Sequence, residues 1–301
     1  MARTFSISDR GNILITALAP LIWGSSYVVL TEFLPGGNPF WLAMLRALPA
    51  GLLLLLVVRQ LPKGIWWQRV FILGALNFTV FWSLLYVAAY RLPGGVAATL
   101  GATQPLLVVF LARAFLGATI RPLAIVAALM GLGGVAMLVL GPNAQWDATG
   151  VLAASASAVS MAFGTVLTRR WQPEVSSLTF TAWQLAAGGI LLLPVALVMS
   201  PELPTFDGKG LLGLAYLAII GAAITYALWF RGVAKLAPAR VSSLSFLSPL
   251  SAVLLGWLIL GEGLSSEELT GVLLTLLSVW LSQNAARIRI FPRSRLSKKG
   301  A

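Results

Sequence analysis

The sequence predicts an all-α polytopic membrane protein with ten transmembrane helices, and three observations carry this prediction. Hydrophobic residues make up 58% of the 301-residue chain and charged residues only 10%, which leaves too little polar surface to cover a soluble protein of this size. Apolar runs of about 20 residues, the length that spans a bilayer, follow one another throughout the chain. Lys and Arg gather in every second connection between these runs.

Ten apolar runs are long enough to cross the membrane, and short turns rich in Pro, Gly and Asn separate them. They cover residues 13–33, 39–58, 70–89, 94–114, 122–140, 149–168, 176–199, 210–230, 240–260 and 268–286. The first run has no small-residue cleavage site behind it, so we expect it to remain as a spanning helix. No connection is long enough to hold a separate domain.

The basic residues set the orientation, because Lys and Arg stay on the cytoplasmic side during insertion. With the N-terminus inside, every Lys and Arg falls in a cytoplasmic segment except Arg46, Arg91 and Lys209. The acidic residues show the opposite bias, since only Asp9 and Glu174 fall inside. Both termini are therefore expected in the cytoplasm, with residues 287–301 as a basic cytoplasmic tail.

The composition also excludes several classes of function. The net charge of +12 does not indicate a nucleic-acid partner, since the basic residues lie in short clusters between apolar runs rather than along one polar face. Cysteine and histidine are both absent, which excludes disulfides, thiol chemistry and metal sites built from thiolate or imidazole. We expect no cofactor, no metal and no enzymatic activity; the expected partners are the lipid bilayer and a small-molecule substrate.

An internal repeat divides the chain. Residues 91–106, RLPGGVAATLGATQPL, share their plan with residues 235–250, KLAPARVSSLSFLSPL, at an offset of 144 positions. Each copy is a turn followed by an apolar helix that contains one proline, Pro105 or Pro249. Weaker matches lie at similar offsets, among them Gly51 with Gly189 and Arg46 with Gln184.

The repeat predicts where a functional site lies. Five helices per half is an odd number, so the halves, 1–145 and 146–286, are expected to lie in the membrane in opposite orientations. Such an inverted repeat places a pseudo-twofold axis in the membrane plane, and transporters bind substrate at the interface between the two halves. We therefore expect substrate-binding residues at that interface.

Arg46 is the only formal charge well inside a predicted span, about seven residues, or 10 Å, from the outer end of the second helix. Two interpretations remain open. The guanidinium lines a central cavity and attracts a substrate carboxylate, or it extends outward and pairs with Glu32. The polar repeat partner Gln184 favours the cavity.

The third and eighth helices carry aromatic faces, on which Trp82 and Tyr226 are repeat mates. Aromatic faces near the axis suit amphipathic organic substrates, through apolar contact and cation–π interaction with an ammonium group. The alternative is that these rings face lipid or pack against other helices. Asn77 lies on the same stretch of the third helix, and an amide in the middle of a span requires a polar neighbour.

The fourth and ninth helices carry hydroxyl and amide side chains before their prolines. Proline removes one backbone donor and clashes with the carbonyl four residues back, which belongs to Gly101 or Ser245. We expect a kink in each helix, which serves either as a hinge for alternating access or as a static bend. The expected hinge residues are Gly101, Pro105, Ser245 and Pro249.

The substrate-binding residues expected at the interface come from seven of the ten helices. They are Trp23, Arg46, Asn77, Phe78, Phe81, Trp82, Thr99, Thr103, Gln104, Trp183, Gln184, Tyr226, Ser243 and Phe246.

Taken together, the inverted ten-helix plan, the twin proline helices, the Trp23-Gly-Ser-Ser26 stretch and the run Leu258-Ile-Leu-Gly-Glu-Gly263 resemble the EamA-type members of the drug/metabolite transporter superfamily. The resemblance covers residues 11–286. It implies transport of small metabolites across the bacterial inner membrane, with the first four helices of each half around a central cavity and the fifth and tenth at the periphery.

Within that superfamily the chain is similar to the YddG-type amino-acid exporters. A member devoted to aromatic amino acids is expected to carry an aromatic residue immediately before the proline of the fourth helix, where Gln104 stands in this sequence. The departure favours a broader range of amino acids.

The function predicted from the sequence is export of neutral amino acids, aromatic ones included, and related small metabolites, by a monomer that works through alternating access. Proton-coupled carriers usually hold Asp, Glu or His inside the membrane. Here the carboxylates nearest a span, Glu32 and Glu262, lie at outer ends, which favours transport driven by the substrate gradient. The alternative is a proton-coupled multidrug or other metabolite efflux carrier.

Overall fold

The computed structural model describes residues 7–35, 37–92, 94–139, 147–261, 263, 265–286 and 288. Within these residues every regular element is a helix. Nine helical stretches of the described chain are long and apolar enough to cross a membrane. The protein is therefore an all-helical, multi-pass membrane protein, as predicted. Glu262 and the basic tail, apart from Ile288, lie outside the described residues.

The helices follow the predicted runs in order. They are α1 (Ile7–Gly24), α2 (Ser26–Phe33), α3 (Pro39–Val58), α4 (Trp66–Gly74), η1 (Ala75–Thr79), α5 (Val80–Arg91), α6 (Gly94–Gly101), α7 (Gln104–Leu116), α8 (Pro122–Val139), α9 (Ala148–Arg170), α10 (Ser177–Met199), α11 (Gly208–Ala218), η2 (Ile219–Ile224), α12 (Thr225–Lys235), α13 (Pro238–Leu244), α14 (Leu247–Ile259) and α15 (Ser266–Asn284).

The tenth predicted span corresponds to α15, which has 19 residues and carries Glu267 and Glu268 in its first turn. These two carboxylates lower its mean hydropathy, and it is not among the nine candidate spans. Ten membrane crossings therefore remain a prediction.

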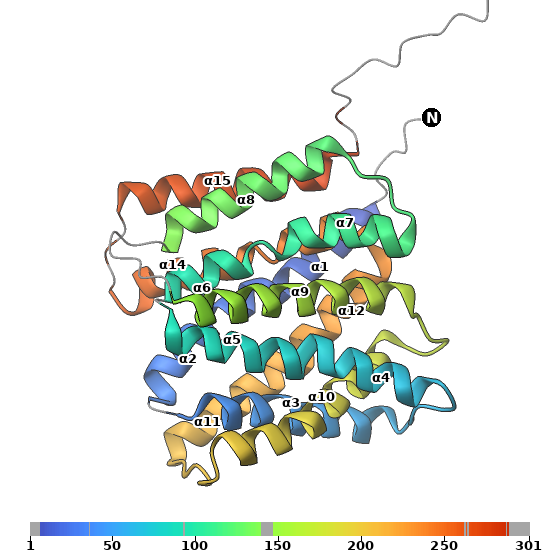
Figure 1. Ribbon diagram of the computed structural model, residues 1–301, viewed down its shortest axis with the longest axis vertical. Coiled ribbons are helices and arrows are strands. Elements are labelled where there is room, and N and C mark those ends of the chain that lie inside the picture. Colours follow the sequence, from blue (N-terminus) through green and yellow to red (C-terminus); the bar gives the residue numbers. More distant parts are fainter. Residues whose placement is uncertain are drawn as a thin grey trace, which may run out of the picture.

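The helices lie side by side, with α8 and α15 together at one edge of the bundle and α3, α10 and α11 at the opposite edge (Figure 1). The described connections between the membrane-length helical stretches lie at the two ends of the bundle (Figure 1). We call the end where α2 stops and α3 begins the α2 end, and the end where α3 stops and α4 begins the α4 end. The basic residues predict that the α2 end faces outward and the α4 end the cytoplasm.

Local sequence signals explain where several helices begin and end. The Asn38 side chain accepts hydrogen bonds from the backbone N–H groups of Phe40 and Trp41, and Pro39 occupies the first helical position, so α3 starts there. The glycines Gly117 and Gly261 end α7 and the α14 region with φ of 64° and 68°, the left-handed conformation that favours glycine. These two glycines are also repeat mates at the offset of 144.

Three predicted runs are interrupted helices. The fourth breaks between Gly101 and Gln104, and the ninth breaks at Ser245 and Phe246, so both breaks lie just before the prolines. The first run breaks at Ser25, which the sequence did not predict because no proline follows it. Ser25 instead donates its hydroxyl to the carbonyl of Ile22 at 2.7 Å, a local bond that competes with regular helix hydrogen bonding.

The third and eighth runs each contain a π-helical segment, η1 and η2, and both segments begin at equivalent positions of the repeat. A π-helical turn carries one extra residue, which shifts the hydrogen-bonding register and makes backbone carbonyls available to side chains. Ser160 uses one of them, since its hydroxyl donates to Leu76 O in η1 at 2.8 Å.

The α3–α10 contact is reciprocal between positions that lie 138 residues apart. A Cβ on Gly51 would lie 2.3 Å from the backbone nitrogen of Ala186, and a Cβ on Gly189 would lie 2.5 Å from the Cα of Leu48. Gly189 lies 138 positions after Gly51, and Ala186 lies 138 positions after Leu48. The two contacts are therefore equivalent to each other at this offset. A pseudo-twofold axis between α3 and α10 would produce this reciprocity, and the inverted repeat itself remains a prediction.

Candidate functional site

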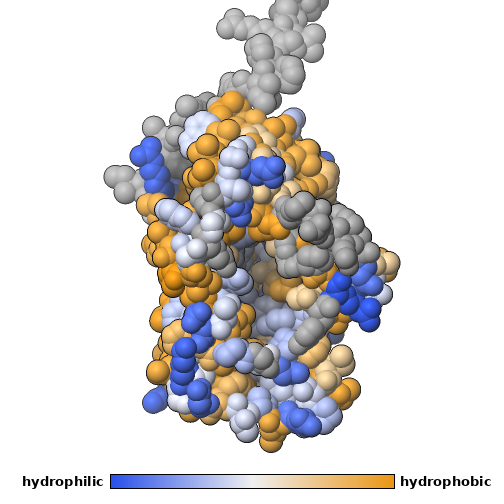
Figure 2. Space-filling view, turned by 90° about the vertical axis from the view of Figure 1, so that its left-hand side faces the viewer, coloured by the Kyte–Doolittle hydropathy of each residue, from blue (hydrophilic) through white to orange (hydrophobic). Residues whose placement is uncertain are grey.

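A cavity of about 380 Å³ lies between the two halves of the chain, in the part of the bundle nearer the α2 end. Viewed from that end, the molecule is hollowed at its centre (Figure 2). Of the residues expected at a site, those lining the cavity are Trp23, Arg46, Phe81, Trp82, Gln104, Tyr226 and Phe246, together with Gly101, Ser245 and Pro249 from the expected hinges. Among the lining residues Arg46 carries the only charge.

Arg46 is held by the π-helical segment η2. Its Nη2 donates to the carbonyl oxygen of Gly221 at 2.6 Å, and its guanidinium carbon lies 5.3 Å from the centre of the Trp82 ring. These contacts turn the side chain toward the interior of the bundle. Within the described residues Glu32 makes no ion pair with it.

The Gly221 carbonyl also fixes the cavity wall formed by α1. Thr225 donates its hydroxyl to this carbonyl at 2.8 Å, and the Thr225 oxygen accepts a hydrogen bond from Trp23 Nε1 at 2.9 Å. A single backbone oxygen in η2 therefore links α1, α3 and α12. In a regular α-helix this carbonyl would accept a hydrogen bond from the backbone N–H four residues later, so the connection depends on the π-helical segment.

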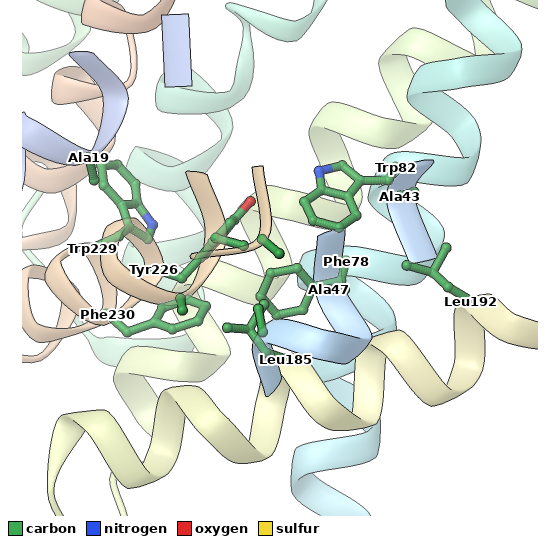
Figure 3. Close-up of a cluster of buried hydrophobic side chains, with 14 of the residues drawn as sticks. Ala19, Ala43, Ala47, Phe78, Trp82, Leu185, Leu192, Tyr226, Trp229 and Phe230 are labelled. Carbon is green, nitrogen blue, oxygen red and sulfur yellow. The ribbon is translucent and has the colours of Figure 1, made fainter. Parts of the chain in front are cut away.

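Aromatic rings form the floor of the cavity. Phe78 lies 4.7 Å from Tyr226 and 5.4 Å from Trp82, and all three are buried. The rings meet between α5 and α12, with Phe230 beside them (Figure 3). Phe78 itself has no exposed surface and does not line the cavity, so it packs beneath the lining rings. Aromatic packing of this kind gives a rigid apolar surface.

Gln104 and Ser245 connect the two interrupted helices. The Ser245 hydroxyl donates to Gln104 Oε1 at 3.3 Å, and Gln104 Nε2 lies 3.5 Å from Thr165 Oγ1. Each residue stands at the break of its own helix. The amide that precedes Pro105 is therefore occupied by protein partners at the cavity wall.

Asn77 and Gln184 lie outside the cavity lining and bond to each other. Asn77 Nδ2 donates to Gln184 Oε1 at 2.9 Å and to Thr168 Oγ1 at 3.1 Å, while Thr168 donates to Gln184 Oε1 at 3.2 Å. None of the three has exposed surface. The polar neighbour that the mid-span amide of Asn77 requires is thus Gln184, the repeat mate of Arg46.

The remaining expected residues have other surroundings. Trp183 donates its indole N–H to Gln60 O at 2.6 Å, at the α4 end. Thr103 and Ser243 bond backbone carbonyls of their own helices, those of Leu100 and Arg240. Trp183, Thr103 and Ser243 are absent from the cavity lining, and so are two further residues, Thr99 and Pro105.

Several lining residues carried no clear signal in the sequence. Ser157 and Met161 lie on α9 at a spacing of four, and Tyr27 and Leu85 are further lining residues of this kind. Three polar atoms of the lining residues are buried without a hydrogen-bond partner, namely Arg46 Nε, Trp229 Nε1 and Ser26 Oγ. Each of these atoms is a hydrogen-bond donor that has no partner in this conformation.

Known proteins resemble this chain over most of its length. The sequence profile of the EamA-like transporter family matches residues 10–140 and 148–283. Protein PecM of Dickeya dadantii is 42% identical over 282 residues, which cover 93% of this chain and 94% of PecM. The uncharacterized inner membrane transporter YedA of Escherichia coli K12 is 32% identical over 254 residues, or 82% of each chain.

A solved crystal structure supports the same fold. It covers 91% of this chain and 98% of its own chain with a TM-score of 0.79, at 22% sequence identity. The two ranges that match the family profile, 10–140 and 148–283, include the residues of the interrupted helices, of the π-helical segments and of the cavity lining. The chain belongs to the EamA-like transporter family and is therefore a membrane transporter.

Proposed function

We propose that this transporter exports neutral amino acids, aromatic ones included, and related small metabolites across the bacterial inner membrane. It does so as a monomer by alternating access, with both termini in the cytoplasm and with the substrate gradient as the driving force. One observation carries the choice of substrate. The cavity is lined by a single charged group, Arg46, and its lining residues hold three donor atoms without partners, Arg46 Nε among them, within walls that are otherwise largely apolar and aromatic.

This arrangement matches the two ends of an amino acid. A carboxylate accepts charge-assisted hydrogen bonds from a guanidinium, and Arg46 Nε with Trp229 Nε1 supplies donors that lack partners. The rings of Trp23, Trp82 and Tyr226 offer apolar area to a side chain and a negative face to an ammonium group. The volume of about 380 Å³ lies within the range of small-molecule sites.

A proton-coupled multidrug carrier is the second candidate. Lipophilic cations are held by carboxylates inside the membrane, and proton relays use Asp, Glu or His there. The residues that line the cavity include none of these side chains. Only the aromatic wall favours this alternative, so it ranks below amino-acid export.

Growth of expressing cells tests the proposal. Cells that carry the transporter should resist toxic amino-acid analogues and remain sensitive to toxic lipophilic cations, compared with cells that carry an empty vector. Resistance to the cations alone would favour the second candidate and contradict amino-acid export.

A further inference from the structure

The cluster of Asn77, Thr168 and Gln184 has hydrogen-bonding capacity left over. Asn77 Oδ1 and Gln184 Nε2 are buried without a partner, although the two side chains bond each other through their other amide atoms. An unpaired buried acceptor and an unpaired buried donor both reduce stability, because each has lost its hydrogen bonds to water. Packing alone therefore does not account for two amides at this position.

The repeat relates this cluster to the Arg46 contact. Arg46 and Gln184 are mates at the offset of 138, and Asn77 and Gly221 are mates at the offset of 144. Arg46 binds Gly221 in η2, and Gln184 binds Asn77 in η1. A polar contact between a helix and a π-helical segment therefore occurs twice. We call the contact of Arg46 with Gly221 the Arg46 link, and the contact of Gln184 with Asn77 the Asn77 link.

The two links have different surroundings. The Arg46 link lines the cavity, whereas the Asn77 link lies beyond the aromatic floor, toward the α4 end. There the bundle is closed by hydrogen bonds from Trp183 Nε1 to Gln60 O and from Arg169 Nη1 to Val233 O, 3.2 Å long in the second case. The structure is therefore open at the Arg46 link and closed over the Asn77 link.

From these relations we infer that Asn77, Thr168 and Gln184 form a second substrate-binding site, which is hidden here and becomes accessible when the carrier opens at the α4 end. The inference rests on the proposed alternating access. In an inverted repeat the opposite-facing state arises when the two halves exchange conformations. The Asn77 link then lines a cavity as the Arg46 link does now.

The free atoms of the cluster define its ligand. Gln184 Nε2 donates to a carboxylate, and Asn77 Oδ1 accepts from an ammonium group. This pair fits the head group of a neutral amino acid. The site carries no charge, so it holds the carboxylate without the ionic contribution that Arg46 makes on the other side.

Cysteine accessibility tests the inference, because the chain contains no cysteine and each introduced thiol is the only one. Gln184→Cys and Thr168→Cys are placed in membrane vesicles of both orientations and treated with a membrane-impermeant methanethiosulfonate. Thr168→Cys retains the Asn77–Gln184 hydrogen bond, so it reports on the site even where Gln184→Cys fails to fold. Leu192→Cys, fully buried on the same helix as Gln184, is the negative control, and Gln60→Cys, exposed at the α4 end, is the positive control.

We expect both site thiols to react from the face that labels Gln60→Cys, at least tenfold faster than Leu192→Cys, and phenylalanine to slow the reaction of Thr168→Cys, which keeps both free amide atoms. Ala102→Cys, at an apolar lining position of the cavity, reports on the opposite face. Rates of both site thiols equal to that of Leu192→Cys from both faces, while Ala102→Cys reacts from the opposite face, would overturn the inference. So would protection of Ala102→Cys by phenylalanine without protection of Thr168→Cys. If both site thiols react but phenylalanine protects neither Ala102→Cys nor Thr168→Cys, the amino-acid substrate fails and the alternating exposure of the cluster stands.

Discussion

The hydroxyl of Ser245 donates a hydrogen bond to the side-chain oxygen of Gln104 across 3.3 Å, and this bond joins the two interrupted helices at their breaks. Each residue precedes a proline, Pro249 or Pro105, and both residues line the cavity. The hydrogen bond thus connects the two breaks at the wall of the cavity.

Replacing the prolines should slow transport without weakening binding. Alanine at position 105 restores the backbone N–H that bonds the Gly101 carbonyl, which favours a straight helix over the broken one. We expect Pro105→Ala to lower turnover roughly tenfold, equivalent to about 1.4 kcal/mol of barrier, at unchanged half-saturation. Initial rates in proteoliposomes measure both quantities. Pro194→Ala, at an exposed position of α10, should behave as wild type; an equal loss in both variants would exclude a hinge at Pro105.

Arg46→Gln tests recognition of the carboxylate. The substitution removes the one charge among the residues that line the cavity. Because a charge-assisted hydrogen bond contributes about 1.5–3 kcal/mol, transport efficiency should fall roughly 10- to 100-fold. Resistance of cells to toxic amino-acid analogues, at matched expression, gives the measurement. Arg113→Gln, exposed near the end of α7, is the matched control. Unchanged resistance in Arg46→Gln would remove Arg46 from the site.

Gly131 provides the space for the ring of Phe246. A Cβ at Gly131 would lie 2.2 Å from Phe246 Cε2, whereas the nearest atom to a Cβ at Gly133 is Leu274 Cδ2 at 3.8 Å. Gly131→Ala should therefore overpack α8 against Phe246, at the break between α13 and α14, at a cost of about 1–3 kcal/mol, and displace a residue of the cavity wall. We expect a lower Tm and slower transport for Gly131→Ala, and neither effect for Gly133→Ala. Equal Tm values for Gly131→Ala and the wild-type protein would contradict this prediction and show that α8 accommodates the added methyl group.

Much of the fold follows from the sequence because hydrophobic runs and turn residues are local signals. The run 39–58 coincides with α3 because Asn38 and Pro39 fix its start. The break at Ser25 and the π-helical segments could not be predicted in this way. A π-helical turn adds one residue without changing composition or hydropathy, and its freed carbonyl is used by residues distant in sequence, such as Arg46 on Gly221.

The site was predictable where a side chain has unusual chemistry for a membrane interior. Arg46 and Gln104 stand out as polar groups in apolar helices, and both line the cavity. Asn77 stands out equally, yet its partner Gln184 is 107 positions away and the pair lies beyond the cavity floor. Met161 carried no signal in the sequence. Apolar side chains on membrane helices occur at cavities, at neighbouring helices and at the lipid, so the residue type does not distinguish these positions.

The most direct test of the account is uptake of labelled phenylalanine into proteoliposomes, with and without an imposed pH gradient. A carrier driven by its substrate gradient, without a carboxylate among its cavity residues, should take up phenylalanine saturably and equilibrate it at the same level in both conditions. Unlabelled phenylalanine should compete, and phenethylamine, which lacks the carboxylate, should not. Sustained accumulation that requires the pH gradient, or uptake no greater than in protein-free liposomes, would contradict the account.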